Sequence, residues 1–422
     1  MKKGRCLDSL DMDRRKFLKL MAIASTGAAF PWRVAHGALE NLIENCSTKV
    51  CLTGVKNGSE DRVLIEAVKN SARAATDFSW LSRGDSVVIK PALNSGNLYP
   101  ATTNPEGIRA VVELLKEKGA GKVIVSDMSG VEHVKLSREN LKGSSRELMN
   151  KSGMAKAALE AGAELYFPEE EGWNAFFEDE PIDSAHWNKG IMMPTILKET
   201  DHIILMPRCG RHVLLGSSLG MKNAVGYWRT DSRLEYHKYA STIQEKTADA
   251  NTVRTLRDKQ RLVLTIGTKV LTTFGPDKGF VAEPETGLVI ASENIVAHDM
   301  VSLAWLLKNR FGMSEEEEKG SKDPYKKQFI VSTANRVVVK LLGGFGDALG
   351  AQKPVRNDLN SIWEDRVLNR AYEVFGGVPK VDLVDIEDSV PRDVKKQLSE
   401  MVSKPNLKTH SLLCGEGLVF RG

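Results

Sequence analysis

Few cysteines, little net charge and no long apolar run beyond the N-terminal segment are the main absences in this sequence. Five cysteines in 422 residues are too few for a small disulfide scaffold, and none of them has the local spacing of a zinc or iron–sulfur site. The formal charge of +4 arises within residues 1–37, which argues against a nucleic-acid-binding surface elsewhere. Because 41% of the residues are hydrophobic, the chain can bury a substantial core, and disorder is excluded as its main state.

The N-terminal segment has the pattern of an export signal. Arg14 and Arg15 precede Lys-Phe-Leu-Lys, which matches a twin-arginine signal, and the moderately apolar stretch that follows is shorter than the ~20 residues that span a bilayer. Small residues at positions −3 and −1 precede a possible cleavage before Ala38. We therefore expect a signal peptide at residues 1–37, the twin-arginine translocase as partner, and a periplasmic mature protein with no membrane span. The alternative is a basic amphipathic helix at a cytoplasmic N-terminus.

Two cysteines near the start of the mature chain leave two possibilities open. Cys46 and Cys51 lie five positions apart, so they could pair in an oxidising compartment. They could equally remain two free thiols.

From residue 49 onward, short β-rich runs alternate with amphipathic helical periods. Strands are predicted at residues 50–55, 85–90, 122–127, 163–167, 201–207, 261–270 and 287–292, and helices at 62–75, 105–118, 138–162 and 295–308. A strand, a helix and a further strand at this spacing form a βαβ unit, which requires a parallel sheet covered by helices. The predicted fold class is α/β: a mostly parallel sheet with helices on both faces, formed by residues 38–311. Residues 312–422 are expected to be an appended, mainly helical region with helices near 328–342 and 361–375 and an edge strand at 381–385.

Ligands of parallel α/β sheets bind beyond the carboxyl ends of the strands, and several polar residues follow predicted strands. The candidates that could hold an anion are Lys90, Asn94, Lys222, Asn223 and Arg233. Residues 216–223 combine backbone N–H groups, hydroxyls and a lysine, which suits a phosphate or carboxylate but is also typical of an ordinary Gly/Ser loop. Arg229, Arg233 and His237 follow one another at intervals of four, which aligns them on one helical face, although a solvated helix can show the same spacing.

Histidines supply the candidates for acid–base or metal chemistry. His212, His237 and Asp299 are the candidate catalytic residues, with a histidine pKa near neutrality expected. A divalent metal would find a two-histidine, one-carboxylate set among His202, His212, His237, His298 and Asp299, but no His-x-x-x-His spacing supports it. An aspartate at the start of a helix more often complements the helix dipole. Walker A, Gly-x-Gly-x-x-Gly and Gly-x-Ser-x-Gly motifs are absent at the strand ends, so the cofactor remains unknown.

Several blocks together resemble the domain-of-unknown-function 362 family. They are Val88-Ile89-Lys90-Pro91-Ala92-Leu93-Asn94, Thr103-Asn104-Pro105-Glu106-Gly107-Ile108-Arg109, Val125-Ser126-Asp127, Ile204-Leu205-Met206-Pro207 with His212, Gly220-Met221-Lys222-Asn223-Ala224-Val225-Gly226, His237, Gly275-Pro276, and Gly287-Leu288-Val289-Ile290-Ala291-Ser292 ending at Asp299. The blocks occur in the family's order over residues 49–307. Two features depart from the family: Lys-Pro-Ala stands where Lys-Pro-Asn is common, and the ferredoxin-like cysteine runs of some members are missing. The resemblance implies the fold and the choice of residues, and it supplies no substrate.

The residues predict an exported enzyme that acts on a small anionic substrate, a carboxylate or a phosphate, at the strand ends. The alternative is a non-catalytic binding or assembly partner of an exported redox enzyme. Convergence of histidine, lysine and aspartate in one pocket favours the enzyme, whereas scattered positions favour the binding partner.

Replacing both Arg14 and Arg15 by lysine is expected to block export. The double substitution keeps the charge but removes the guanidinium groups that a receptor can recognise. A folded, uncleaved precursor should then accumulate in the cytoplasm, as measured by cell fractionation and immunoblotting. Unchanged periplasmic accumulation would contradict the twin-arginine assignment.

Overall fold

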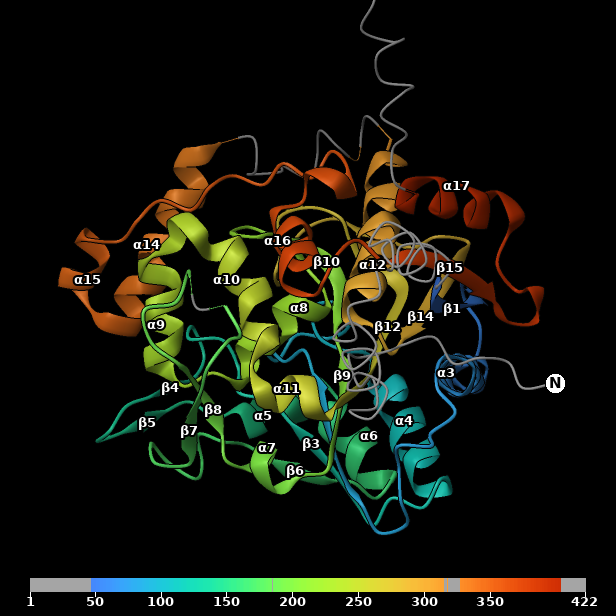
Figure 1. Ribbon diagram of the computed structural model, residues 1–422, viewed down its shortest axis with the longest axis horizontal. Helices are drawn as coiled ribbons and strands as arrows, with labels where there is room; N and C mark the ends of the chain where they lie inside the picture. The colour runs from blue at the N-terminus through green and yellow to red at the C-terminus, as the bar shows by residue number, and fades with distance from the viewer. Residues whose placement is uncertain (1–46, 184, 315–316, 318–326, 404–422) are drawn as a thin grey trace, which may run out of the picture.

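The apolar runs of the sequence become the strands of one large sheet (Figure 1). The computed structural model describes residues 47–183, 185–314, 317 and 327–403, so the expected signal peptide and Cys46 lie outside the described residues. The strands follow the order β15 (Lys380–Asp385), β1 (Ser47–Lys56), β14 (Thr286–Ser292), β12 (Gln260–Leu271), β9 (His202–Met206), β2 (Ser86–Pro91), β3 (Lys122–Ser126) and β6 (Glu164–Tyr166). From β12 to β6 all neighbours are parallel, whereas β14 is antiparallel to both β1 and β12. The predicted α/β class with a mostly parallel sheet is confirmed.

Alternate residues of the central strands face two different cores. In β2, Val87 and Ile89 pack on the side of α3 (Asp61–Ala75), α4 (Pro105–Glu117) and α6 (Met154–Glu160), while Val88 belongs to the opposite core. That second core includes α10 (Ile243–Asp249), and a third lies beneath α12 (Ile295–Phe311). Strands buried on both faces are continuously apolar, and the apolar runs of the predicted strands are buried throughout: Val88, Ile89, Val123, Ile124, Val125, Ile203, Ile204 and Leu205.

The expected helix at residues 138–162 is wrong, and two glycines explain why. The chain forms the short strands β4 (Lys135–Leu136) and β5 (Leu141–Lys142) and then two short helices, α5 (Ser145–Lys151) and α6. Gly143 and Gly153 adopt φ angles of +78° and +83°, a left-handed conformation that interrupts a helix. Ser144 begins α5, because its hydroxyl accepts a hydrogen bond from the Glu147 N–H.

The C-terminal region contributes both helices and a strand. Its elements are α14 (Gln328–Gly343), α15 (Phe345–Leu349), a 3-10 turn η5 (Ile362–Glu364), α16 (Arg366–Val374), β15 and α17 (Arg392–Val402). The expected edge strand is confirmed, because β15 pairs parallel with β1 at the end of the sheet. Residues beyond 311 therefore complete the central sheet, and α14 reaches the candidate site described below.

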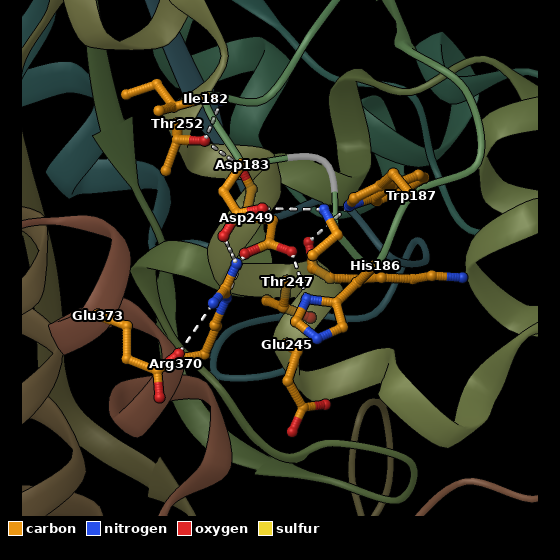
Figure 2. Close-up of polar contacts among 12 residues, drawn as sticks. Ile182, Asp183, His186, Trp187, Glu245, Thr247, Asp249, Thr252, Arg370 and Glu373 are labelled. Carbon is orange, nitrogen blue, oxygen red and sulfur yellow. Dashed lines mark hydrogen bonds and ion pairs between the residues drawn. The ribbon is translucent and has the colours of Figure 1, made fainter.

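The buried carboxylate of Asp249 in α10 binds Arg370 of α16 (Figure 2). Asp249 is fully buried, and its two oxygens accept hydrogen bonds from Arg370 Nε at 2.6 Å and His186 Nδ1 at 2.7 Å. The same guanidinium also binds Asp183 and Glu373. Because an unpaired buried charge costs several kcal/mol, these partners stabilise the contact between the C-terminal region and the sheet domain.

The substitution Ile124→Ala is expected to lower the free energy of unfolding by about 2–5 kcal/mol, because it leaves a cavity between buried side chains. Chemical denaturation measures the change. The matched control is Leu159→Ala, since Leu159 is 53% exposed and should cost less than about 0.5 kcal/mol. Equal effects of the two substitutions would contradict the assignment of Ile124 to the core.

Candidate functional site

A cavity of about 310 Å³ lies at the carboxyl ends of β2, β3, β9 and β12. Seven of the eight candidate residues from the sequence line it: Lys90, Asn94, His212, Lys222, Asn223, Arg233 and His237. Asp127, Glu132 and Asp277 add carboxylates, and Ala334, Val337, Val338 and Leu342 add an apolar wall. Among the described residues, Asp299 is the one candidate that does not line this cavity.

The chain reaches the cavity three times within thirty residues. After β9 it continues through Pro207 into β10 (Arg208–His212), which pairs with β12 and with β11 (Gly216–Ser218) and carries His212 at its end. The short helix α8 (Gly220–Asn223) then brings Lys222 and Asn223 to the wall. Helix α9 (Thr230–Lys238) follows with Arg233 and His237 one turn apart.

A hydrogen-bonded network of Lys90, Asp127 and Asn223 forms the floor of the cavity. The Lys90 ammonium donates to Asp127 Oδ1 at 3.0 Å, to Asn223 Oδ1 at 3.0 Å and to the Pro91 carbonyl at 2.9 Å. The Asn223 amide donates in return to the Lys90 carbonyl, and the Leu93 N–H donates to Asp127 Oδ2. Burial lowers the pKa of Lys90, and the Asp127 carboxylate opposes that shift. Because all three protons of Lys90 are engaged, this lysine positions its neighbours rather than offering a cation to a ligand.

Gly226 lets the chain pass close to this ion pair. A Cβ atom at this position would overlap the Asp127 carboxylate and the Lys90 ammonium. The Gly226 carbonyl also accepts hydrogen bonds from the Met128 N–H and from Arg233 Nη2, each at 3.2 Å. Glycine is therefore required at position 226, in the connection between α8 and α9 that passes over Lys90 and Asp127.

Backbone carbonyls hold the Arg233 guanidinium in place. Its Nη2 donates to the Met128 and Gly226 carbonyls, and its Nη1 donates to the Ser129 carbonyl. Burial lowers the pKa of Arg233 to about 10, against the attraction of Asp127 and Glu169, so the group stays charged at neutral pH. Arg233 thus supplies positive potential and fixes the loop after β3, while most of its donors are already used.

Lys222 differs from the other cations of the cavity. Nowhere in the described part of the chain does its ammonium find a hydrogen bond or an ion pair, although Lys90, Arg208 and Arg233 are close enough to repel it. Burial, followed by these three cations, lowers its pKa to about 7. An unpaired ammonium among other positive charges is the group of this cavity best suited to hold an anion.

The ring of His237 is fixed by α14. Asn335 donates through Nδ2 to the carbonyls of His237 and Gln352, so its Oδ1 faces His237 Nδ1 at 3.0 Å. An amide oxygen only accepts, so the proton of the neutral imidazole lies on Nδ1 and Nε2 carries a lone pair. Burial lowers the pKa of His237 to about 3, which keeps the ring neutral at physiological pH.

His212 has the opposite tautomer. The Leu214 N–H donates to His212 Nδ1 at 3.2 Å, so in the neutral ring the proton lies on Nε2. Burial, together with the charge of Lys222, holds the pKa of His212 well below its usual range. The expectation of histidine pKa values near neutrality is therefore corrected: low-dielectric surroundings keep both rings uncharged, one with a donor and one with an acceptor at Nε2.

The remaining candidates lie at the edge of the cavity or away from it. Asn94 donates to the Ala101 carbonyl at 2.8 Å and approaches Asp277, which Ser95 also binds. Asp299 accepts hydrogen bonds from the N–H groups of Gly220 and Met221 at 2.9 and 2.8 Å, so it positions α8 from below. Arg229 of the aligned Arg-Arg-His set pairs with Asp231 outside the cavity.

The residues considered for a metal do not gather in one place. His202 binds Asp85 at 3.0 Å near the amino end of β9, and His298 binds Asp299 at 2.8 Å beneath α8. Within the described ranges, no three side chains of histidine, cysteine, aspartate or glutamate are grouped as metal ligands. No helix among residues 47–403 that the structure describes is long and apolar enough to cross a membrane.

Three residues of the site, Asp127, Asp277 and Asn335, were not among the residues predicted from the sequence, where Asp127 entered only as the end of the Val125-Ser126-Asp127 block. A signal for Asn335 exists, because it stands at intervals of four from Val331 and Val339, and an asparagine on the buried face of a helix is costly unless a partner satisfies it. The partner lies 98 positions away in the sequence, so the residue type alone does not identify it.

Two solved structures align with part of this chain. A crystal structure of a protein from Thermotoga maritima aligns at 12% identity with a TM-score of 0.32, over 51% of this chain and 52% of that one. The lactate racemase apoprotein from Thermoanaerobacterium thermosaccharolyticum aligns at 14% identity with a TM-score of 0.33, over 59% of this chain and 55% of that one. These alignments span about half of each solved structure, and none of the curated proteins matches the chain.

The model of one family matches residues 87–304, which include β3, β9, β12, all of β2 except Ser86, and every candidate catalytic or binding residue from the sequence. That span is about half of the chain and falls within residues 49–307, over which the sequence blocks resemble the same family. The chain belongs to the family described as Domain of unknown function (DUF362).

Proposed function

We propose that this protein is an enzyme that binds a small anionic substrate, a carboxylate or a phosphate, in the cavity and transfers protons by its two histidines. The observation that carries the proposal is the unpaired Lys222 ammonium beside two neutral imidazoles of opposite tautomer. A purely structural cluster would satisfy the lysine with a carboxylate, as Lys90 is satisfied by Asp127.

Lys222 would hold the anionic group. Its pKa of about 7 leaves it partly charged at neutral pH, and an arriving anion stabilises the charged form. Arg233 adds positive potential from a position that its own hydrogen bonds fix, and Lys90, paired with Asp127, holds Asn223 in place. The substrate would therefore meet preorganised groups, and its binding would shift Lys222 toward the charged form.

The two histidines divide the proton transfers between them. His237 accepts a proton at Nε2, while its Nδ1–H stays on Asn335 Oδ1 and stabilises the imidazolium that forms. His212 donates a hydrogen bond or a proton from Nε2, because the Leu214 N–H occupies its Nδ1. A base and an acid on one substrate fit the enzyme better than the alternative of an assembly partner, for which neither tautomer would matter.

We also propose that the protein reaches the periplasm by the twin-arginine pathway. The support is the Arg14-Arg15 pair and the apolar stretch that follows it. A folded cavity with several buried charges suits a pathway that exports folded proteins, since none of these groups would have to assemble after transport.

The substitution Lys222→Met is expected to weaken anion binding at least tenfold, because a charged hydrogen bond contributes about 1.5–3 kcal/mol. A screen of small carboxylates and phosphates by thermal unfolding identifies ligands of the parent, at a stabilisation of about 2.7 kcal/mol for a hundredfold excess over Kd. Without ligand, the variant should unfold at the same temperature or higher, since Lys222 has no partner to lose. The control Lys142→Met changes an exposed lysine outside the cavity and should alter nothing.

The substitution His237→Asn separates catalysis from binding. Asparagine places its Nδ2 where His237 has Nδ1, so it can still donate to Asn335 Oδ1, but it has no basic nitrogen; the variant should therefore bind the anion and fail to turn it over or to exchange its protons with deuterated water. Binding without any turnover or exchange in the parent would instead support a binding protein.

Anion affinity is expected to fall as the pH rises through about 7. Lys222 is charged below its pKa and neutral above it, so the association constant approaches a tenfold loss per pH unit on the alkaline side. Burial lowers the pKa of His212 well below its usual range and that of His237 to about 3, so neither ring contributes to the change in affinity around pH 7. Calorimetry with a carboxylate avoids the titration of phosphate itself.

The matched control for this titration is Lys222→Arg, which keeps the charge over the whole range and should give a flat profile. Affinity that rises with pH in the parent would contradict the role of Lys222 and point to a ligand that needs deprotonated side chains.

A further inference from the structure

We infer that the substrate is an amphiphilic monoanion: one carboxylate-like group joined to a short apolar body that lies against α14. This inference rests on the proposed function and names the substrate class for the same cavity. It comes from the unequal walls of the cavity, which are charged on the side of the strand ends and apolar on the side of α14.

One face of α14 forms the apolar wall. Ala334, Val338 and Leu342 follow one another at intervals of four and therefore lie in a row along the helix, and Val337 lies beside them. None of the residues that α14 contributes to the lining is charged or polar. Figure 1 shows α14 beside α9, and Asn335 joins the two helices through His237.

The apolar wall continues beyond α14. The residues that extend it come from the loop after β10, from the turn after α8 and from the loops after β2 and β3: Leu93, Met128, Val213, Leu214 and Val225. Apolar surface around a cavity binds apolar groups of a ligand, and a phosphate or a polar metabolite would leave this surface unmatched.

The charges favour a single negative group. Lys90 is neutralised by Asp127, Arg233 is held by carbonyls, and Lys222 is the cation that remains without a partner in the described chain. Glu132 and Asp277 also line the cavity, so a second anionic group on the ligand would meet carboxylates. A monocarboxylate therefore fits better than a dicarboxylate of the same length.

The volume limits the size of the apolar body. About 310 Å³ lies at the lower end of the range for small-molecule sites, which is roughly 300–1,000 Å³. Val337 belongs to the lining and is 49% exposed, so the apolar wall extends to the rim of the cavity. Added methylene groups should improve binding until they reach this rim and then have no further effect.

The test is calorimetric titration of the mature protein with straight-chain monocarboxylates of two to eight carbons, and with dicarboxylates of equal length. We expect the Kd to fall about fourfold for each added methylene until the cavity is filled, which is the effect of burying one such group. Each dicarboxylate should bind more weakly than the monocarboxylate of its length.

Two variants of α14 locate the apolar body. Val338→Thr keeps the shape of a wall residue but adds a hydroxyl, so it should reduce the gain per methylene and leave the shortest acid unaffected. Leu341→Thr is the matched control, because Leu341 lies on the same helix, is 38% exposed and does not line the cavity. Val337→Thr provides a half-exposed second wall variant in which folding is not at risk.

The outcomes separate the inference from the proposed function. A Kd that depends on Lys222 but not on the length of the acid would overturn the inference and leave the proposed function standing. The same conclusion would follow if Val338→Thr and Leu341→Thr reduced the gain in affinity per methylene equally. Long acids that bind equally well to Lys222→Met would reveal nonspecific association and also overturn it. Failure of every anion to bind in a Lys222-dependent manner would overturn both.

Discussion

The buried ion pair between Lys90 and Asp127 is the interaction on which the rest of the site depends. Two opposite charges removed from water are tolerated only when their remaining hydrogen-bonding capacity is satisfied, and here Asn223, the Pro91 carbonyl and the Leu93 N–H supply the partners. These partners come from the loop after β2 and from α8, so satisfying the pair also brings those segments together. The ion pair also requires glycine at position 226, because a side chain there would displace Lys90 and Asp127.

The cations Lys90, Arg233 and Lys222 have different roles in the site, although the sequence does not distinguish them. Lys90 and Arg233 have donors committed to the protein, and their burial is compensated by carboxylate and carbonyl oxygens. Lys222 has no such compensation, and burial together with repulsion from both of them lowers its pKa, so that its charge can respond to an anion. Such an uncompensated group reduces stability in the empty protein, and a buried group of this kind is more often found at a functional site than in a structural core.

Sequence patterns predicted the sheet and the location of the cavity because both follow from local rules. Continuous apolar runs such as Val87 to Ile89 indicate strands buried on two faces, and polar residues after them must meet at one edge of a parallel sheet. The same rules could not distinguish Lys90 from Lys222, since the difference lies in which oxygen each ammonium reaches. They failed at residues 138–162, where the periodicity predicts one long helix but Gly143 and Gly153 interrupt it. They also gave Asp299 a chemical role, whereas it accepts the N–H groups that begin α8.

The contribution of α14 to the site is the feature that the sequence predicted least. This helix contacts both the histidine proposed as the base and the apolar part of the cavity. One face of this helix supplies Asn335, which sets the tautomer of His237, and a neighbouring face supplies Val338 and the other wall residues. A displacement of α14 would therefore change the basic nitrogen and the apolar wall together. Because Asn335 also binds the carbonyls of His237 and Gln352, two backbone contacts hold the helix in the position that both functions need. The region that local patterns set apart from the sheet domain thus completes the site, and the physical link is the satisfied amide of Asn335, the one polar residue on the buried face of α14.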